Sequence, residues 1–428
     1  MKQSTKKIIF PLIVLLIVIM IILFFSIPNF HKKTKIKVKS KNLNYTDIYH
    51  LNISKKDTIV FAGDTLTKNY PIECFFEDVS YKKYGYEGMV IEDFTNEEFG
   101  QIQKDNPTIL IIEIGIDELL KENDKSQYLK NMENLVQKLQ KEMKKSRIYI
   151  ESLYPIIETT DIPITNEDII EINKELKEII DSSSITYIDL YHHLQEKGQL
   201  ASQYSLDGIH LNEEGYARVS TTLRAYLKGK INNNNNIYNI KVGPTEEIVM
   251  IGDSLTDLYP INGFFENIPI MNNGRSGYTT TDILDNLKEL VYIYNPSKVF
   301  LNIGINDMSD TDRNQEEIYE NIVKIVEEIK EHRPNAKIYV QSIYPMNTSN
   351  DKKIKRSSVE ARSMEEINYI NNKLKEKFHN SNVTYIDVYK ELIDENGLLK
   401  INYTIDGVHF TICGYNKISS VLLKYIAE

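Results

Sequence analysis

The sequence predicts an α/β protein of two tandem domains, each a flavodoxin-like three-layer α/β/α arrangement built on a parallel sheet. One observation is a duplication: Gly63–Asp117 aligns without a gap on Gly252–Asn306, 189 residues further along. The other is an alternation, since short apolar runs rich in β-branched residues alternate with amphipathic helical stretches, as in a parallel sheet covered on both faces. At 428 residues, the chain also exceeds what one hydrophobic core usually fills.

In the second copy, five short apolar runs are expected to form strands and one longer run a helix. The expected strands are, in order, Ile248–Ile251, Ile268–Met271, Val299–Ile303, Ile338–Gln341 and Val383–Ile386. The helix is expected over Glu316–Glu331, where apolar residues recur on one face. Sheets of this kind bind ligands beyond the carboxyl ends of their strands.

The N-terminal segment is expected to anchor the chain in a membrane. Ile8–Ile27 is an uncharged run of 20 residues, long enough as a helix to span the hydrocarbon core. Three lysines precede it and no small-residue cleavage signature follows, which favours a single-pass anchor over a cleaved signal peptide. Six lysines follow it, and the positive-inside rule alone would place the domains in the cytoplasm. Because long domains translocate largely regardless of charge, we expect them to be extracellular.

The expected organisation is an anchor at 1–30, a lysine-rich stalk at 31–57, a first domain at 58–230, an asparagine-rich linker at 231–246 and a second domain at 247–428. A net charge of −10 argues against nucleic acid as a partner, since phosphate binding needs basic faces. Cys74 and Cys413 fall at non-equivalent places in the repeats, so no disulfide framework is expected. No metal or cofactor is expected, because no cluster of metal-ligating residues stands out in the sequence.

Candidate site residues of the second copy come just after its expected strands. Ser254 follows the first strand, Gly274 the second and Asn306 the third, and Asp406 and His409 follow the fifth. Each has a simpler explanation when taken alone: a helix N-cap for the serine, a turn for the asparagine, and a cap with a satisfied histidine for the last pair. Those explanations leave the shared placement at strand ends unexplained.

The motifs resemble those of the SGNH/GDSL hydrolase family, which is named for its serine, glycine, asparagine and histidine. The resemblance covers both repeats and rests on Gly252-Asp253-Ser254-Leu255, Asn273-Gly274-Arg275-Ser276-Gly277, Gly304-Ile305-Asn306-Asp307 and Asp406-Gly407-Val408-His409. It implies a serine esterase in which His409 activates Ser254 and Asp406 orients the imidazole. It also implies an oxyanion hole formed by the backbone amides of Ser254 and Gly274 and the side-chain amide of Asn306.

The first copy carries the same positions with two changes. Thr65 replaces the serine and Asp117 replaces the asparagine, while Gly85, Asp207 and His210 are retained. The extra methyl group of threonine stiffens the side chain and crowds the approach to its hydroxyl. A carboxylate at 117 only accepts hydrogen bonds, and it sets negative charge beside a developing oxyanion. We therefore expect a pseudoenzyme domain, inactive or severely impaired, that supports the structure, binds substrate or has no role beyond shared ancestry.

Between the fourth and fifth expected strands, the second copy is eight residues longer than the first. This loop carries Lys352, Lys353, Lys355, Arg356 and Arg362, whereas the first copy has Glu158, Asp161, Glu167 and Asp168 there. A loop at this edge borders the cleft, and its charges either attract an anionic substrate or are simply solvated.

The expected activity is hydrolysis of small acyl esters, acetyl first, on the cell-surface glycans of a bacterium. The bacterial source is inferred from a composition rich in lysine, isoleucine and asparagine. The alternatives are a lysophospholipase-like esterase, an enzyme that transfers acyl groups to glycans, and a glycan-binding surface protein with two inactive copies. No multi-span segment is evident that would deliver an acyl donor, which weighs against transfer, and the intact second set of residues weighs against a binder.

Overall fold

The computed structural model describes residues 57–228, 247–266, 268–309 and 313–428. The anchor expected at Ile8–Ile27, the stalk up to residue 56 and the asparagine-rich linker lie outside the described residues. Among the helices of the described ranges, none is long and apolar enough to cross a membrane. All of the described residues belong to one compact unit.

Each repeat forms a five-stranded parallel sheet, and the two sheets have the same strand order. The order is β2-β1-β3-β4-β5 in the first repeat and β9-β8-β10-β11-β12 in the second. Every neighbouring pair is parallel. This is the order of a flavodoxin-like doubly wound sheet, so the prediction of two parallel α/β domains is confirmed.

The strands of the first sheet are β1 (Thr58–Gly63), β2 (Ser80–Gly85), β3 (Ile109–Glu113), β4 (Arg147–Glu151) and β5 (Thr186–Ile188). Those of the second sheet are β8 (Ile248–Gly252), β9 (Ile270–Gly274), β10 (Lys298–Asn302), β11 (Lys337–Gln341) and β12 (Val383–Ile386). A small antiparallel hairpin joins β6 (Gln195–Glu196) to β7 (Gln199–Leu200).

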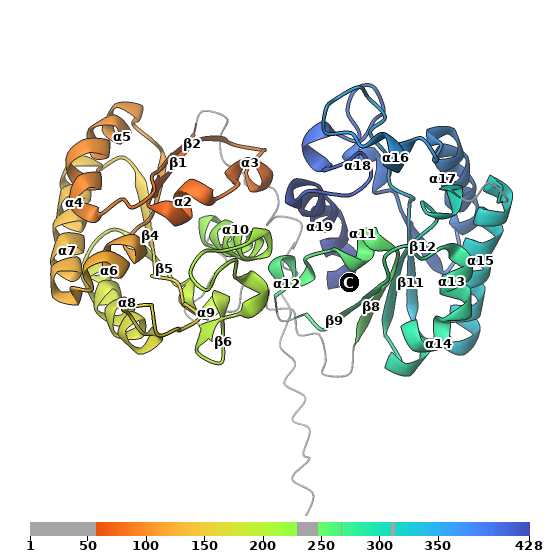
Figure 1. Ribbon diagram of the computed structural model, residues 1–428, viewed down its shortest axis with the longest axis horizontal. Helices are drawn as coiled ribbons and strands as arrows, with labels where there is room; N and C mark the ends of the chain where they lie inside the picture. The colour runs from red at the N-terminus through yellow and green to blue at the C-terminus, as the bar shows by residue number, and fades with distance from the viewer. Residues whose placement is uncertain (1–56, 229–246, 267, 310–312) are drawn as a thin grey trace, which may run out of the picture. The chain divides into compact units, whose positions relative to one another are not determined.

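The α-helices of the first repeat are α2 (Thr65–Asn69), α3 (Ile72–Phe75), α4 (Ile91–Asp93), α5 (Phe99–Asp105), α6 (Ile116–Glu122), α7 (Lys125–Glu142), α8 (Asn166–Asp181), α9 (Tyr191–Leu194) and α10 (Glu213–Leu227). Those of the second are α11 (Ser254–Asp257), α12 (Ile261–Phe264), α13 (Thr280–Asp285), α14 (Leu287–Leu290), α15 (Gln315–His332), α16 (Arg356–Val359), α17 (Met364–Phe378), α18 (Tyr389–Leu392) and α19 (Ile412–Ala427). In the second repeat, α15 and α17 cover one face of the sheet and α19 the other (Figure 1).

The cores of both domains follow from the apolar patterns of these elements. Strands β1, β3, β8 and β10 are buried along almost their whole length. Helix α15 buries the apolar face that the sequence indicates, including Ile318, Ile322 and Ile329. The expected second strand was placed wrongly, because β9 begins at Ile270 and runs through polar residues to Gly274. As an edge strand it has one side unpaired, so its sequence need not be continuously apolar.

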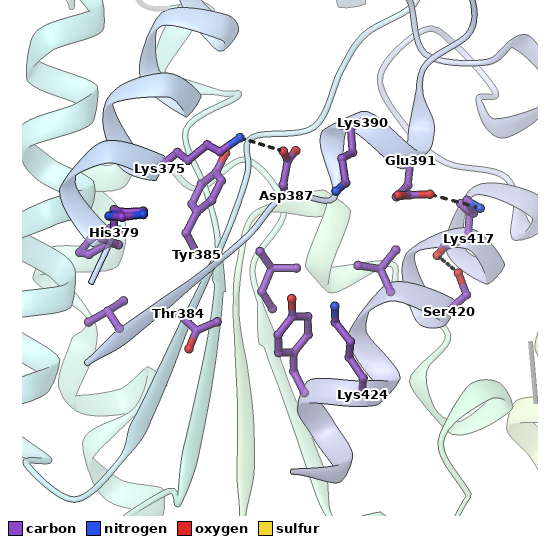
Figure 2. A pocket seen from close by; sticks show the side chains of 15 residues that line it. Lys375, His379, Thr384, Tyr385, Asp387, Lys390, Glu391, Lys417, Ser420 and Lys424 are labelled. Carbon is purple, nitrogen blue, oxygen red and sulfur yellow. Dashed lines mark hydrogen bonds and ion pairs between the residues drawn. The ribbon is translucent and has the colours of Figure 1, made fainter. Parts of the chain in front are cut away.

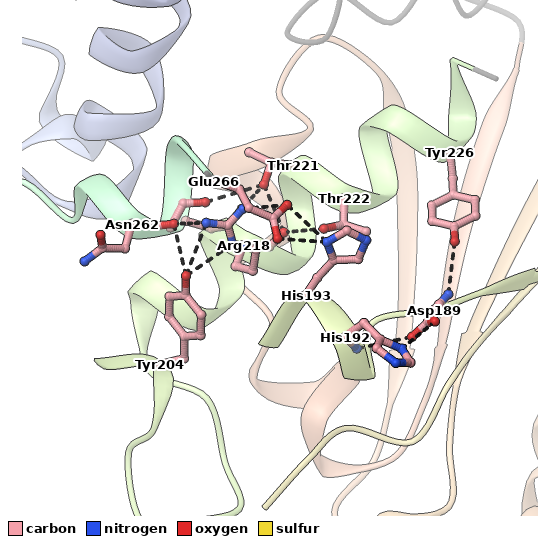
Figure 3. A network of polar contacts seen from close by, with 12 residues as sticks. Asp189, His192, His193, Tyr204, Arg218, Thr221, Thr222, Tyr226, Asn262 and Glu266 are labelled. Carbon is pink, nitrogen blue, oxygen red and sulfur yellow. Dashed lines mark hydrogen bonds and ion pairs between the residues drawn. The ribbon is translucent and has the colours of Figure 1, made fainter. Parts of the chain in front are cut away.

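The two repeats contact each other through two pairs of helices. In each pair, a short helix of one repeat packs on the last helix of the other. Helix α3 of the first packs on α19 of the second, and its counterpart α12 packs on α10. Across the first contact, Tyr403 Oη donates to Glu77 Oε2 at 3.0 Å. Across the second, the Glu266 carboxylate meets the buried Arg218 guanidinium at 3.1 Å and the His193 ring at 3.0 Å (Figure 3). Such a reciprocal pairing is the pattern of an isologous interface.

Cys74 on α3 and Cys413 on α19 form a disulfide, so the expectation that the chain has no disulfide framework is wrong. That expectation compared equivalent positions of the repeats, and these two cysteines are not equivalent. The packing of α3 on α19 brings non-equivalent positions together, so a sequence separation of 339 residues is no obstacle to the bond. A structural disulfide is typical of oxidising compartments rather than of the cytosol.

We predict that replacing both Cys74 and Cys413 by serine lowers the free energy of unfolding by about 2–5 kcal/mol, because the bond closes a long loop. Chemical denaturation of the non-reduced protein measures this loss. Mass spectrometry after alkylation without reductant provides the control, since the native protein should take up no label. Free alkylation of both thiols in the folded protein would contradict the assignment.

Candidate active site

Ser254, His409 and Asp406 lie together at the carboxyl edge of the second sheet. Ser254 Oγ and His409 Nε2 are 3.0 Å apart, although 155 residues separate them in the chain. The other ring nitrogen, His409 Nδ1, is 2.8 Å from Asp406 Oδ2. Ser254 is almost buried at 8% exposure, while His409 is half-buried. The structure therefore brings the predicted nucleophile, base and acid into one hydrogen-bonded chain.

The turn between β8 and α11 holds the serine in place. Asp253 is the N-cap of α11, because its Oδ1 accepts from the Leu255 N–H at 2.9 Å. Ser254 is therefore not the cap, and its hydroxyl is free to reach His409. Gly252 precedes the turn, where a β-carbon would lie only 2.2 Å from the Asn302 carbonyl oxygen of the neighbouring strand. Only glycine allows this close approach of β8 to β10.

The loop before α19 presents the acid and the base together. Asp406 Oδ1 accepts from the backbone N–H groups of Val408 and His409, so a tight turn fixes the carboxylate. Gly407 takes a φ of +104°, in the region that favours glycine, and its N–H donates to Thr404 Oγ1. The spacing of three residues between aspartate and histidine is thus set by local backbone geometry.

The pKa values of this pair are shifted by their contact. Partial burial would raise the pKa of Asp406, but hydrogen bonds from the His409 ring and from two backbone N–H groups hold it well below its usual range. The hydrogen bond to Asp406 raises the pKa of His409, and burial and the Arg362 charge oppose that rise. Burial also raises the pKa of Asp253 to about 7. The carboxylate at 406 therefore stays charged and favours the imidazolium form.

Asn306 follows β10 in the chain and precedes α15, and both ends of its side-chain amide are hydrogen-bonded. Its Nδ2 donates to the Tyr278 carbonyl at 3.0 Å, and its Oδ1 accepts from Arg362 Nη2 at 3.1 Å. The following residue, Asp307, is fully buried and accepts from Thr280, which ties the loop to α13. These contacts fix the orientation of the Asn306 amide. Its role as an oxyanion donor stays a prediction.

Gly274 lies at the end of β9, but its backbone amide already donates to Asn272 Oδ1 at 3.0 Å. A β-carbon at 274 would lie 2.2 Å from the Asp257 backbone nitrogen, so close packing of α11 on β9 explains the glycine. Gly85 is constrained in the same way by Lys68 of the first copy. The role of Gly274 as an oxyanion donor stays a prediction, and the first copy points to a different glycine.

In the first copy, the Asp117 carboxylate gathers the donors that an oxyanion would need. Asp117 Oδ2 accepts from the Thr65 backbone N–H at 3.1 Å, from the Thr65 hydroxyl at 2.5 Å and from the Gly88 N–H at 2.9 Å. The counterpart of Gly88 in the gapless alignment is Gly277, which sequence reasoning missed. The sequence signal is that Gly277 belongs to the quoted motif. In the structure its φ is +84°, in the region that favours glycine.

The first copy keeps its acid and base but does not join them to the hydroxyl. Asp207 Oδ2 and His210 Nδ1 are 2.7 Å apart, as in the second copy. Among the described residues, however, the Thr65 hydroxyl bonds to Asp117 and to Gly88, not to His210. The carboxylate thus both occupies the donors and holds the hydroxyl away from its base.

Buried acids beneath the first copy's cleft replace amides of the second. Glu151 stands where the second copy has Gln341, and it accepts from Tyr154 as Gln341 accepts from Tyr344. Burial raises the pKa of Glu151 to about 8 and raises that of Glu113 well above its usual range. Burial thus favours the protonated form of both carboxyls, and a neutral carboxyl group resembles an amide in shape.

A groove of about 690 Å³ lies elsewhere on the second domain, along the edge strand β12 and between α17 and α19 (Figure 2). Lys375 faces Asp387 at 3.6 Å, and Lys417 faces Glu391 at 3.6 Å, so part of its charge is paired. None of the predicted site residues lines this groove. It is separate from the serine site.

A hydroxyl, an imidazole and a carboxylate linked in this order at the carboxyl edge of a parallel sheet define the class of serine hydrolases. Comparison with known proteins specifies the class further. The profile of the GDSL-like Lipase/Acylhydrolase family matches residues 76–218 and 250–417, one match in each repeat. The chain belongs to this family.

Individual relatives match about one repeat each. N-acylneuraminate cytidylyltransferase of Escherichia coli O18:K1:H7 is 29% identical over 185 residues, which are 42% of this chain and 40% of that relative. The chain thus spans well under half the length of this curated relative. A Streptococcus pneumonia structure, provisionally assigned as a platelet activating factor, is 32% identical with a TM-score of 0.40, over 43% of this chain and 86% of that one. A GDSL-like lipase from Bacteroides thetaiotaomicron is 23% identical with a TM-score of 0.38, over 42% and 88%.

We predict that Asp406→Asn lowers kcat/KM by about 10³–10⁴-fold and moves the acid limb of its pH profile to lower pH. Activity rises as His409 loses its proton, and the bond to Asp406 raises the pKa of that ring. Asp253 and Arg362, the other charged groups that act on it, are unchanged in the variant. A pH series of initial rates measures the shift. If the acid limb of the pH profile did not move in the Asp406→Asn variant, the role of Asp406 as the partner of His409 would be contradicted.

We predict that Glu151→Gln makes the protein more stable, and increasingly so from pH 5 to pH 8. Since the folded-state pKa is about 8 and the usual value is 4.5, the folded protein holds a proton that the unfolded chain has lost in that window. The wild-type protein therefore loses stability as pH rises, by up to a few kcal/mol. Calorimetry at several pH values measures the difference. The matched control is Gln341→Glu, which should introduce the same pH dependence of stability into the second domain. If the stability of the wild-type protein and of both variants changed with pH in parallel, the account would be contradicted.

Proposed function

We propose that this protein is a membrane-anchored serine esterase whose second domain removes small acyl groups, acetyl first, from cell-surface glycans. The observation that carries the proposal is the chain from Asp406 through His409 to Ser254, with separations of 2.8 and 3.0 Å. A serine hydroxyl becomes an effective nucleophile only when a base removes its proton, and this geometry provides that base.

The proposed reaction has two halves. In the first, Ser254 Oγ attacks the ester carbonyl while His409 Nε2 takes the hydroxyl proton, and the proton then passes to the departing alcohol. In the second, His409 deprotonates a water that attacks the acyl-serine, which releases the carboxylic acid and restores the serine. The oxyanion of each step is bound by the backbone amides of Ser254 and Gly277 and the side-chain amide of Asn306.

The choice of Gly277 over Gly274 rests on the first copy. There a carboxylate oxygen is held by the amides of Thr65 and Gly88, the counterparts of Ser254 and Gly277. A carboxylate oxygen resembles an ester oxyanion in charge and in the donors it attracts. This contact supports the assignment of Gly277 to the oxyanion site, and the first domain is proposed to be inactive because its carboxylate already occupies these amides.

Three observations support work at the cell surface on glycans. The disulfide between Cys74 and Cys413 favours an oxidising compartment, and the apolar run at Ile8–Ile27 is long enough for an anchor. Lys352 and Lys353 are exposed on the loop beside the site, where they favour an acidic polymer. The curated relative is named for an N-acylneuraminate, which is a sugar acid.

We predict that Ser254→Ala abolishes ester hydrolysis, whereas Thr65→Ala leaves it within about twofold, because only Ser254 bonds to a histidine. Rates are measured on p-nitrophenyl esters of increasing chain length, acetylated sugars and lysophospholipid. Substantial activity in the Ser254 variant would refute the assignment of the site.

The same panel separates the alternatives. Preference for lysophospholipid would favour a lipid esterase, and acyl transfer to an added glycan in place of hydrolysis would favour a transferase. The absence of any turnover by the wild-type protein would favour a glycan-binding surface protein.

A further inference from the structure

The longer loop between β11 and α17 in the second repeat contacts the acid of the triad. Ser358 Oγ donates to Asp406 Oδ2 at 3.2 Å, and the Lys355 backbone N–H donates to the Asp406 carbonyl at 2.8 Å. Val359 also packs on the same turn, since a β-carbon at Gly407 would lie 2.7 Å from its side chain. The Lys355 backbone, Ser358 and Val359 therefore pack against the loop that holds Asp406, so this segment is not simply solvated.

Arg362, at the end of this loop, points inward to the other half of the site. Its Nε donates to the Ile305 carbonyl at 3.0 Å, and its Nη2 donates to Asn306 Oδ1 at 3.1 Å. Its Nη1 donates to the Ser358 carbonyl, so the guanidinium also braces the loop itself. One side chain thus connects the loop that holds Asp406 to the residue that supplies the amide donor.

The contact fixes which way the Asn306 amide faces. A guanidinium only donates, so the amide must present its oxygen to Arg362 and its nitrogen to the opposite side. That nitrogen donates to the Tyr278 carbonyl in the absence of substrate. The half-buried Arg362 cation beside the Asn306 oxygen also polarises the Asn306 amide. This polarisation strengthens the N–H groups of the amide as hydrogen-bond donors.

The first copy lacks this arrangement. Counting back from the N-caps Ser363 and Thr165 of the equivalent helices α17 and α8, the counterpart of Arg362 is Ile164. The first copy therefore pairs an aspartate at 117 with an aliphatic residue, whereas the second pairs an asparagine with a cation. The cation thus accompanies the amide in the second copy, and the equivalent position of the first copy, which has the carboxylate, carries no cation.

We propose that Arg362 is a positioning residue for ester hydrolysis, which orients and polarises the Asn306 amide toward the oxyanion. The inference rests on the proposed esterase function of this site. It differs from the expectation that the basic loop merely attracts anionic substrates, because it assigns Arg362 to the chemical step. Arg362 then affects kcat more than KM, even with an uncharged ester.

The experiment measures kcat and KM of Arg362→Gln and Arg362→Lys on p-nitrophenyl acetate between pH 5 and pH 9. The glutamine variant is expected to lose about 10–100-fold in kcat, less than the 10²–10³-fold typical of a lost oxyanion donor, with KM within about twofold. The lysine variant keeps the charge but loses the planar guanidinium, which donates to several acceptors at once. Its kcat is therefore expected to lie between those of the wild-type protein and the glutamine variant.

The pH profile gives a second readout. The Arg362 charge lowers the pKa of His409, while Asp406 and Asp253 raise it. The acid limb of the glutamine variant therefore moves to higher pH, and that of the lysine variant moves less. The matched control is Arg356→Gln, which removes the same charge from the same loop. Because Arg356 donates to Thr348, Ser349 and Asn350 of its own loop, this control should leave kcat unchanged.

A double-mutant cycle with Asn306→Ala separates positioning from a general structural effect. If Arg362 acts through Asn306, Arg362→Gln costs less than about threefold in kcat once the amide is gone. An equal loss in both backgrounds would overturn the proposal, as would a raised KM with an unchanged kcat. Failure of the esterase assignment has a different signature, which is undiminished activity in Ser254→Ala.

Discussion

The hydrogen bond between Ser254 Oγ and His409 Nε2 is the interaction on which the rest of the site depends. It joins two loops that are 155 residues apart in the chain, and neither loop can place its side chain alone. Parallel strands make this possible because their carboxyl ends share one edge, where the turn after β8 meets the loop before α19. The buried core of β8, β10 and α15 is thus the scaffold that keeps the two atoms within 3.0 Å.

The two repeats share one fold but differ in the side chains around the position of the nucleophile. A change from amide to carboxylate at one position turns a donor into an acceptor, and the Asp117 carboxylate then occupies the donors that a substrate would need. Deeper in the first domain, Glu151 replaces an amide without disrupting the packing, because burial keeps it protonated. These replacements therefore leave the architecture intact, and the first domain still contributes the packing of α3 on α19 and the disulfide.

Much of this could be predicted from the sequence, since alternating apolar runs define the sheet and its carboxyl edge collects Ser254, Asn306, Asp406 and His409. Features that depend on which surfaces meet could not be predicted in this way. The bond between Cys74 and Cys413 arises from the packing of the repeats, which the alignment of one repeat on the other does not contain. Likewise, the sequence shows the charge of Arg362 but not that its guanidinium turns inward to Asn306, and it shows Gly277 without the donor geometry that its counterpart reveals.

The most direct test is to treat the wild-type protein with a fluorophosphonate and map the adduct by mass spectrometry. Such a reagent reacts only with a hydroxyl that a neighbouring base activates and an oxyanion site supports. One adduct per chain, on the peptide that contains position 254 and none at position 65, is the predicted result. An unlabelled protein, or label at the threonine of the first repeat, would contradict a single live site in the second domain.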